Sequence, residues 1–218
     1  MTTNHETTLT PPFRAEAAQE HIDCAIDSLM ASLPDPALLS NEERRGIIAR
    51  YSAVLEGNFI YWMTGAYLAV RSAEAKAEIE ENLLEEVKDN HPGMLRRFAV
   101  AAHAEPTEVD RRAVDRVLQN VRAFVGKMHP LKIVVMMAFF EGFIQKFMAY
   151  LADLAARRGS SEMVYTDVHG VCDVAHTAGL FDAFAAERAM AKNSTSSEEL
   201  LEGVKLLRTL IQTIVRPE

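Results

Sequence analysis

The chain has 218 residues, of which 49% are hydrophobic and 25% are charged, and its formal net charge is −8. This composition is close to that of ordinary folded domains and excludes a disordered chain, while the negative charge without clustered Lys and Arg argues against a nucleic-acid binder. The two cysteines cannot supply the disulfide framework typical of small secreted proteins.

The N-terminal segment Met1–Pro12 is rich in Thr and has neither the basic start nor the apolar core of a signal peptide. We expect a disordered tail over residues 1–12 and a single helical domain over residues 13–218. The longest apolar stretch, Ile133–Phe140, lies between Lys132 and Glu141 and is too short to cross a bilayer. We therefore expect a cytoplasmic protein without membrane or nucleic-acid partners, and the sequence leaves a homodimer open.

Apolar residues recur at spacings of three and four along the rest of the chain, and no stretch alternates for long enough to predict a strand. The pattern predicts an all-α fold. Prolines, glycines and serines separate the predicted helices and mark their ends. These helices cover Pro12–Ser32, Asn41–Arg71, Ala73–Asn90, Met94–Ala104, Thr107–Lys127, Leu131–Arg157, a helix that follows Ser161, and a last helix that ends at Val215.

The helix that follows Ser161 carries two histidines and a carboxylate at helical spacing. His169, Asp173 and His176 fall within roughly 60° of one another around a helix, so both imidazoles and the carboxylate point to one place. A single histidine on an apolar face is more often a hydrogen-bonded core residue than a metal ligand. The conjunction of all three residues instead indicates a transition-metal site.

Carboxylates also occur where the pattern predicts burial. Glu141 sits in the middle of the most apolar helix, where an ionised carboxylate needs a cation or hydrogen-bond donors to compensate it. Glu56 precedes Ile60 and Met63 at helical spacings and is expected to point inward as well. In the acidic helix Ala73–Asn90 we expect Glu86 to be the inward glutamate and its neighbour Glu85 to lie on the wet face.

With His91 as a third histidine, these residues form a donor set rich in carboxylates, which suits paired iron or manganese better than structural zinc. The set is too large for one ion that also leaves room for a substrate, so two metal ions are implied. One pair presents a geometric difficulty, because residues five apart lie about 140° apart around a helix and Glu86 and His91 would diverge. The sequence His91-Pro92-Gly93 offers a reason for a local distortion that would bring them together.

Taken together, four segments resemble the heme-oxygenase-like diiron oxidase and oxygenase superfamily. They are Asn82–Glu86, His91–Phe98, Glu141, and the run from Tyr165 through His169 and Asp173 to His176. The resemblance implies a heme-oxygenase-like bundle of about seven helices that binds two iron ions, with manganese as the alternative metal, and no heme. It implies that the ligands are Glu56, His91, Glu141, His169, Asp173 and His176, with Glu86 as an extra carboxylate.

The resemblance also implies dioxygen as co-substrate, an external electron donor and a small-molecule substrate. We expect oxidation of an amine- or carboxylate-bearing metabolite such as an amino acid, by N-oxygenation or by oxidative C–C cleavage. Two other classes stay open: a non-catalytic helical interaction protein, and a thiaminase-like or cofactor-free enzyme on the same fold. The last class needs a nucleophilic cysteine, but Cys172 points about 100° away from Asp173 around the helix and Cys24 has no evident base nearby.

Overall fold

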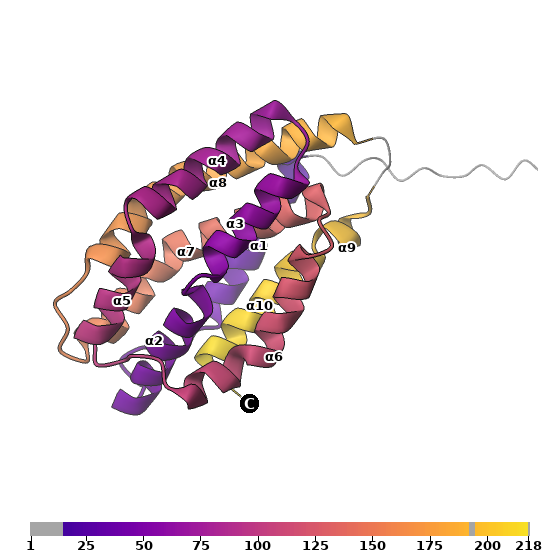
Figure 1. The fold of residues 1–218 in the computed structure, drawn as a ribbon. Helices are drawn as coiled ribbons and strands as arrows, with labels where there is room; N and C mark the ends of the chain where they lie inside the picture. Colours follow the sequence, from indigo (N-terminus) through magenta and orange to yellow (C-terminus); the bar gives the residue numbers. More distant parts are fainter. Residues whose placement is uncertain (1–14, 192–194, 218) are drawn as a thin grey trace, which may run out of the picture.

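The computed structural model describes residues 15–191 and 195–217, and every regular element in these ranges is an α-helix (Figure 1). The predicted tail, Met1–Pro12, lies outside the described residues. The helices are α1 (Ala15–Ala31), α2 (Asn41–Leu55), α3 (Asn58–Ala69), α4 (Ala73–Lys88), α5 (His91–Ala101), α6 (Glu108–Val125), α7 (Pro130–Ala156), α8 (Val164–Met190), α9 (Ser197–Leu200) and α10 (Glu202–Val215). The all-α prediction is confirmed, with more helices than the sequence indicated.

Polar caps define where several of these helices begin. The Ser40 side chain accepts a hydrogen bond from the backbone N–H of Glu43, and the Glu43 carboxylate accepts one from the backbone N–H of Ser40. Thr107 and Asp110 form the same reciprocal capping box at the start of α6. Each box satisfies N–H groups that have no partner inside the helix, which is why the predicted starts of α2 and α6 agree with the structure.

The predicted second helix, Asn41–Arg71, is in fact two helices. Helix α2 ends at Leu55, and Gly57 adopts a left-handed conformation with φ +79° before α3 begins at Asn58. Glycine adopts this conformation at little steric cost, whereas a side chain there would be strained. Residues before and after Gly57 therefore do not share one helical face, and the expectation that Glu56 aligns with Ile60 fails for this reason.

The junction between α4 and α5 also differs from the expectation that His91-Pro92-Gly93 interrupts a helix. The break lies earlier, at Asn90, which has φ +56° and caps α5 by accepting a hydrogen bond from the backbone N–H of Gly93. His91 is the first residue of α5, and Pro92 occupies the first turn, where its missing N–H costs nothing. The chain thus bends between α4 and α5 at Asn90 (Figure 1).

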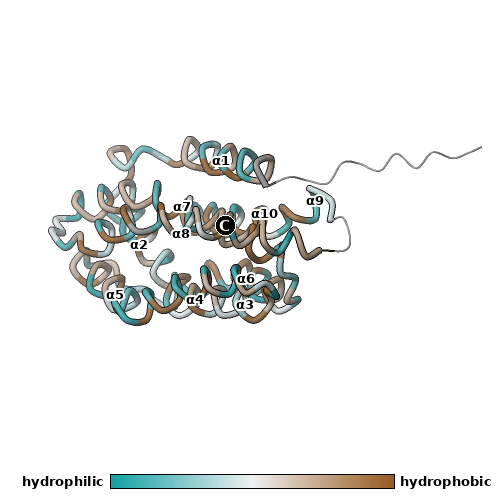
Figure 2. Tube along the Cα trace, turned by 90° about the horizontal axis from the view of Figure 1, so that it is seen from above, coloured by the Kyte–Doolittle hydropathy of each residue, from teal (hydrophilic) through white to brown (hydrophobic). Residues whose placement is uncertain are grey.

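Helix α7 forms the centre of the bundle and packs against α1, α2, α3, α8 and α10. Seen from above, α1 lies along one edge and α3 to α6 along the other, with α7 and α10 between them (Figure 2). By length and composition the whole of α7 could cross a membrane, although the uninterrupted apolar stretch Ile133–Phe140 within it is too short. In its most apolar window 78% of the residues are buried inside the protein, as expected for a core helix.

Candidate metal centre

Helices α4 and α8 lie side by side and run in opposite directions, with α7 packed against α8 (Figure 1). At one end of this pair the Glu187 carboxylate accepts a hydrogen bond of 2.6 Å from the backbone N–H of Ser72, which precedes α4. Further along, His176 of α8 lies opposite Glu85 of α4. The last turns of α4 therefore face the histidines in the first half of α8.

Six of the seven predicted ligands come together where α4, α5, α7 and α8 meet, and they form two groups of three. The first, called here the His91 group, consists of Glu86, His91 and His169. The second, called the His176 group, consists of Glu141, Asp173 and His176. In each group the potential ligand atoms lie within 4.8 Å of one another.

In the His91 group a single carboxylate oxygen faces two imidazoles. Glu86 Oε1 lies 2.9 Å from His91 Nδ1 and 3.4 Å from His169 Nε2. The two rings meet edge to face, with their centroids 4.5 Å apart. All three residues are buried. The left-handed conformation of Asn90, where the chain bends between α4 and α5, is what brings Glu86 and His91 to the same place.

The hydrogen bonds of His169 indicate that a proton or a cation is needed between its Nε2 and Glu86 Oε1. His169 Nδ1 lies 2.9 Å from the backbone carbonyl oxygen of Tyr165 and must donate to it, because a carbonyl only accepts. In the neutral ring Nε2 then carries a lone pair, and that lone pair faces Glu86 Oε1. A proton or a metal cation between the two atoms removes the repulsion. Buried His91 Nε2 makes no hydrogen bond to any described residue, which also fits a metal ligand.

In the His176 group, Nδ1 of the imidazole lies 3.8 Å from Asp173 Oδ1 and 4.0 Å from Glu141 Oε2. The other ring nitrogen, Nε2, lies 3.1 Å from Glu85 Oε2. Asn82 donates a hydrogen bond of 2.9 Å to Glu141 Oε1. These outer contacts hold Glu141 and His176 while one atom of each still faces the centre of the group, which is the usual arrangement behind metal ligands.

The pKa values of the two buried glutamates are shifted in opposite directions. Burial raises the pKa of Glu141 from its ordinary 4.5 to about 7, although His176 and Asn82 favour the ionised form. Burial acts to raise the pKa of Glu86 too, but the contacts with His169 and His91 outweigh it, and the pKa lies below its ordinary value. Neither glutamate is paired with an arginine or lysine in the described part of the chain. A bound cation would therefore compensate both.

Two residues of α4 contact the predicted ligands and were not proposed as part of the site. Asn82 is buried against Glu141. Glu85 was expected on a solvent-exposed face, but it is half-buried because it lies against His176. A signal for both was present in the sequence. Asn82, Glu85 and Glu86 are three and four residues apart, so they share one side of α4.

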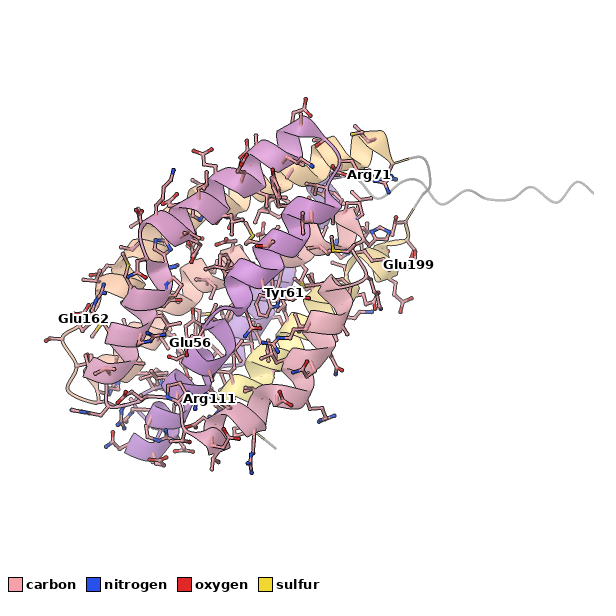
Figure 3. The ribbon with its side chains drawn as sticks, in the orientation of Figure 1. Glu56, Tyr61, Arg71, Arg111, Glu162 and Glu199 are labelled. Atoms are coloured by element: carbon pink, nitrogen blue, oxygen red, sulfur yellow. The ribbon has the colours of Figure 1, made fainter. Side chains whose placement is uncertain are left out.

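Glu56 does not join either group, and the expectation that it points inward is wrong. Its side chain is 46% exposed and forms an ion pair with Arg96 of α5 (Figure 3). The cause is the break at Gly57, which ends α2 and turns the backbone at Glu56 away from the face that an unbroken helix would present.

A narrow cavity adjoins the His91 group. Apart from Glu86, His91, Glu141 and His169, its walls are mostly apolar and include Leu55, Phe59, Ile60, Pro92, Leu95, Phe140, Ile144 and Tyr165. The room for water-sized molecules is about 20 Å³, which is on the order of one or two water molecules. Tyr165 also places its ring 4.3 Å from that of His169 and shares a hydrogen bond of 2.8 Å with the hydroxyl of buried Tyr51.

Comparison with known proteins gives an independent result. A model of the family described as iron-containing redox enzyme matches residues 48–210, which include all six converging residues. None of the curated proteins and none of the solved structures that were compared matches the chain. Because the family match covers most of the chain and the helical bundle agrees with it, the protein belongs to the iron-containing redox enzymes of the heme-oxygenase-like superfamily.

Proposed function

We propose that this iron-containing redox enzyme is a non-heme diiron oxidase or oxygenase that uses dioxygen to oxidise a small molecule bearing an amine or a carboxylate. The observation that carries the proposal is the pair of buried donor groups, each with three potential ligands. His169 and Asp173 are four residues apart on α8, so the two groups are separated by about one helical turn, or roughly 6 Å of rise. That separation supports two adjacent ions.

The donors fit iron. Each group combines carboxylate and imidazole, a mixture that suits iron or manganese, and no described cysteine takes part. His91 and His169 would hold one ion with Glu86, and His176 and Asp173 would hold the other with Glu141. When bound, ferrous ions supply electrons to dioxygen and offer it open coordination positions.

The donors and the cavity fit a pair of ions better than a heme. A heme needs a large flat cavity and one or two axial ligands, whereas three buried carboxylates and three imidazoles converge in the present centre. The adjoining cavity, with about 20 Å³ of room for water-sized molecules, is small beside the hundreds of Å³ that are typical of pockets for drug-sized ligands.

The protein's own residues would hold and orient the ligands and keep water away. The Tyr165 carbonyl fixes the orientation of the His169 ring, Asn82 fixes Glu141, and Glu85 fixes His176. The apolar walls of the cavity limit the water that reaches the His91 group. Electrons for repeated turnover would come from an external donor, and the reaction would be an N-oxygenation or an oxidative C–C cleavage.

The test combines metal analysis, spectroscopy and oxygen uptake. The protein is loaded with ferrous iron under argon, its iron content is measured, and a Mössbauer spectrum is recorded before and after exposure to oxygen. We expect two irons per chain and oxygen consumption that is lost in H176N. His103, exposed in the loop after α5, provides the matched control H103N, which should retain both irons. One iron or none per wild-type chain, or no oxygen uptake, would contradict the proposal.

The substrate needs a separate measurement. Iron-loaded protein is incubated with candidate amines, carboxylates and amino acids in the presence of oxygen and a chemical reductant, and the products are identified by mass spectrometry. A mass gain of one oxygen supports N-oxygenation, whereas loss of a carbon fragment supports cleavage. Oxygen uptake that no candidate stimulates would count against a metabolic oxygenase and in favour of an iron oxidase.

A further inference from the structure

The narrow cavity beside the His91 group touches both groups of potential metal ligands. Glu86, His91 and His169 of the His91 group line part of its wall, and so does Glu141 of the His176 group. A molecule seated in this cavity would therefore lie next to donors of both groups. This position suits a reactant that has to meet two metal ions at once.

The remaining walls of the cavity are apolar from the donors to the surface. Of the residues that line the cavity, Ile60 of α3 and Pro92 of α5 are half-buried, and all the others are buried. The cavity therefore comes nearest to the solvent between these two residues, and neither side chain offers water a hydrogen bond. Tyr165 is the one polar residue among these remaining walls, and its hydroxyl is bonded to that of Tyr51 at 2.8 Å.

The size of the cavity restricts what it can hold. Its room for water-sized molecules is about 20 Å³, on the order of one or two water molecules, which admits a diatomic molecule and excludes an amino acid. A buried water molecule needs about two to four polar partners. The donors would direct their lone pairs at the metal ions, and the other walls are apolar. A small apolar molecule is therefore the favoured occupant.

From this arrangement we infer that the cavity is the site where dioxygen is held next to the metal centre. Dioxygen is diatomic, neutral and apolar, so its transfer from water into an apolar cavity is favourable, as it is for other apolar guests of dry cavities. A charged molecule would lose its hydration there without compensation. The inference rests on the proposed function, because it names the place where the co-substrate of the same centre binds.

Dioxygen is paramagnetic and speeds the nuclear relaxation of groups that it touches, so it reports its own position without iron. The full-length chain, isotopically labelled at its Ile and Leu methyl groups, is treated with EDTA, and methyl relaxation is measured by NMR under argon and under oxygen pressure. We expect the oxygen-induced relaxation of Leu55, Leu95 and Ile144, which line the cavity, to exceed several-fold that of Ile26 and Leu118, which do not. All five residues are only 2–8% exposed, so contact with the solvent does not explain such a difference. A sample loaded with zinc, which has no redox chemistry, should show the same pattern.

A variant with a filled cavity should lose the effect. In L95F the larger side chain takes up the room, so the oxygen-induced relaxation of Leu55 and Ile144 should fall to that of Ile26. L118F is the matched control, because Leu118 is similarly buried on α6 and lies outside the cavity, and it should keep the wild-type pattern. Iron-loaded L95F should also react with dioxygen several-fold more slowly per bound iron than L118F in stopped-flow measurements. Circular dichroism would show whether both variants fold, and the wild-type comparison decides the question if L95F does not.

Two results would overturn the inference: relaxation at the cavity methyl groups no greater than at Ile26 and Leu118, or enhanced relaxation that L95F leaves unchanged. The measurement is separate from the test of the proposed function. Dioxygen in the cavity of a chain that binds no iron would keep the dioxygen site and remove the diiron proposal. Two irons and oxygen uptake in a chain whose cavity methyl groups are unaffected would keep the diiron proposal and remove the dioxygen site.

Discussion

Replacing Glu141 with Gln should stabilise the metal-free protein while weakening its hold on metal. In the unfolded chain this carboxyl loses its proton near pH 4.5, whereas burial in the folded chain raises its pKa to about 7. Between these values the folded state binds more protons than the unfolded state, so the stability of the wild type falls as the pH rises. Gln has no proton to lose and keeps an oxygen that can accept from Asn82.

The magnitude follows from the size of the pKa shift. A difference of about 2.5 units at 1.36 kcal/mol per unit corresponds to about 3 kcal/mol above pH 7. At pH 5 the same treatment gives less than about 1 kcal/mol, because this pH is only about half a unit above the pKa of the unfolded chain and the carboxyl of the folded chain is still protonated. E141Q should therefore exceed the wild type in stability by about 3 kcal/mol at pH 8 and by little at pH 5.

The assay is urea unfolding of EDTA-treated protein at pH 5 and pH 8, followed by circular dichroism at helical wavelengths. E80Q is the matched control, because Glu80 is an exposed glutamate on α4 and its replacement should change little. Ferrous iron should then stabilise the wild type more than E141Q. A difference between wild type and E141Q that stays constant with pH, or a less stable E141Q at pH 8, would refute the reasoning.

Three further changes test how the fold supports the centre. N90A should lower the free energy of unfolding by about 1 kcal/mol, because the cap is lost and alanine is strained at φ +56°, and it should weaken iron binding by His91. N90G should lower the free energy of unfolding by less. Unfolding and iron titrations would measure both effects, and equal iron affinities of the wild type and N90A would contradict the prediction. D110N should cost about 1–3 kcal/mol at pH 7, because buried Asp110 accepts two hydrogen bonds from Arg45. The contacts with Arg45 and Thr107 outweigh burial and lower the pKa of Asp110, so the stability that its carboxylate contributes is present above about pH 4 and is lost below it. The difference in unfolding free energy between the wild type and D110N should therefore narrow below that pH. A difference that widens on acidification would argue against this. E187Q should lower stability by about 1–2 kcal/mol, because Glu187 accepts from the backbone N–H groups of Arg71 and Ser72, and faster amide exchange there would localise the effect.

Several features of the site could be predicted from local sequence. The face shared by His169, Asp173 and His176 depends only on helical periodicity, and the structure places all three at the centre. Glu141 stood out because a carboxylate in the most apolar stretch of the chain needs a partner, and it is buried beside His176 and Asn82. The starts of α2 and α6 followed from their capping residues.

Other features depended on the path of the backbone between helices. Whether Glu86 and His91 converge was decided by the left-handed conformation of Asn90, and whether Glu56 points inward was decided by that of Gly57. Periodicity assumes an unbroken helix, so it cannot locate such breaks. The contact of Glu85 with His176 likewise required the antiparallel alignment of α4 with α8.

The sequence by itself determined the helical class and the identity of most metal-ligand candidates, because spacing along one helix fixes which side chains share a face. The tertiary structure alone decided which helices face each other, how the donors divide into two groups, and which apolar side chains line the cavity beside the His91 group. The physical reason is that these properties arise from contacts between residues far apart in the chain. Local hydrophobic patterns set each helix's buried face but do not specify its neighbour.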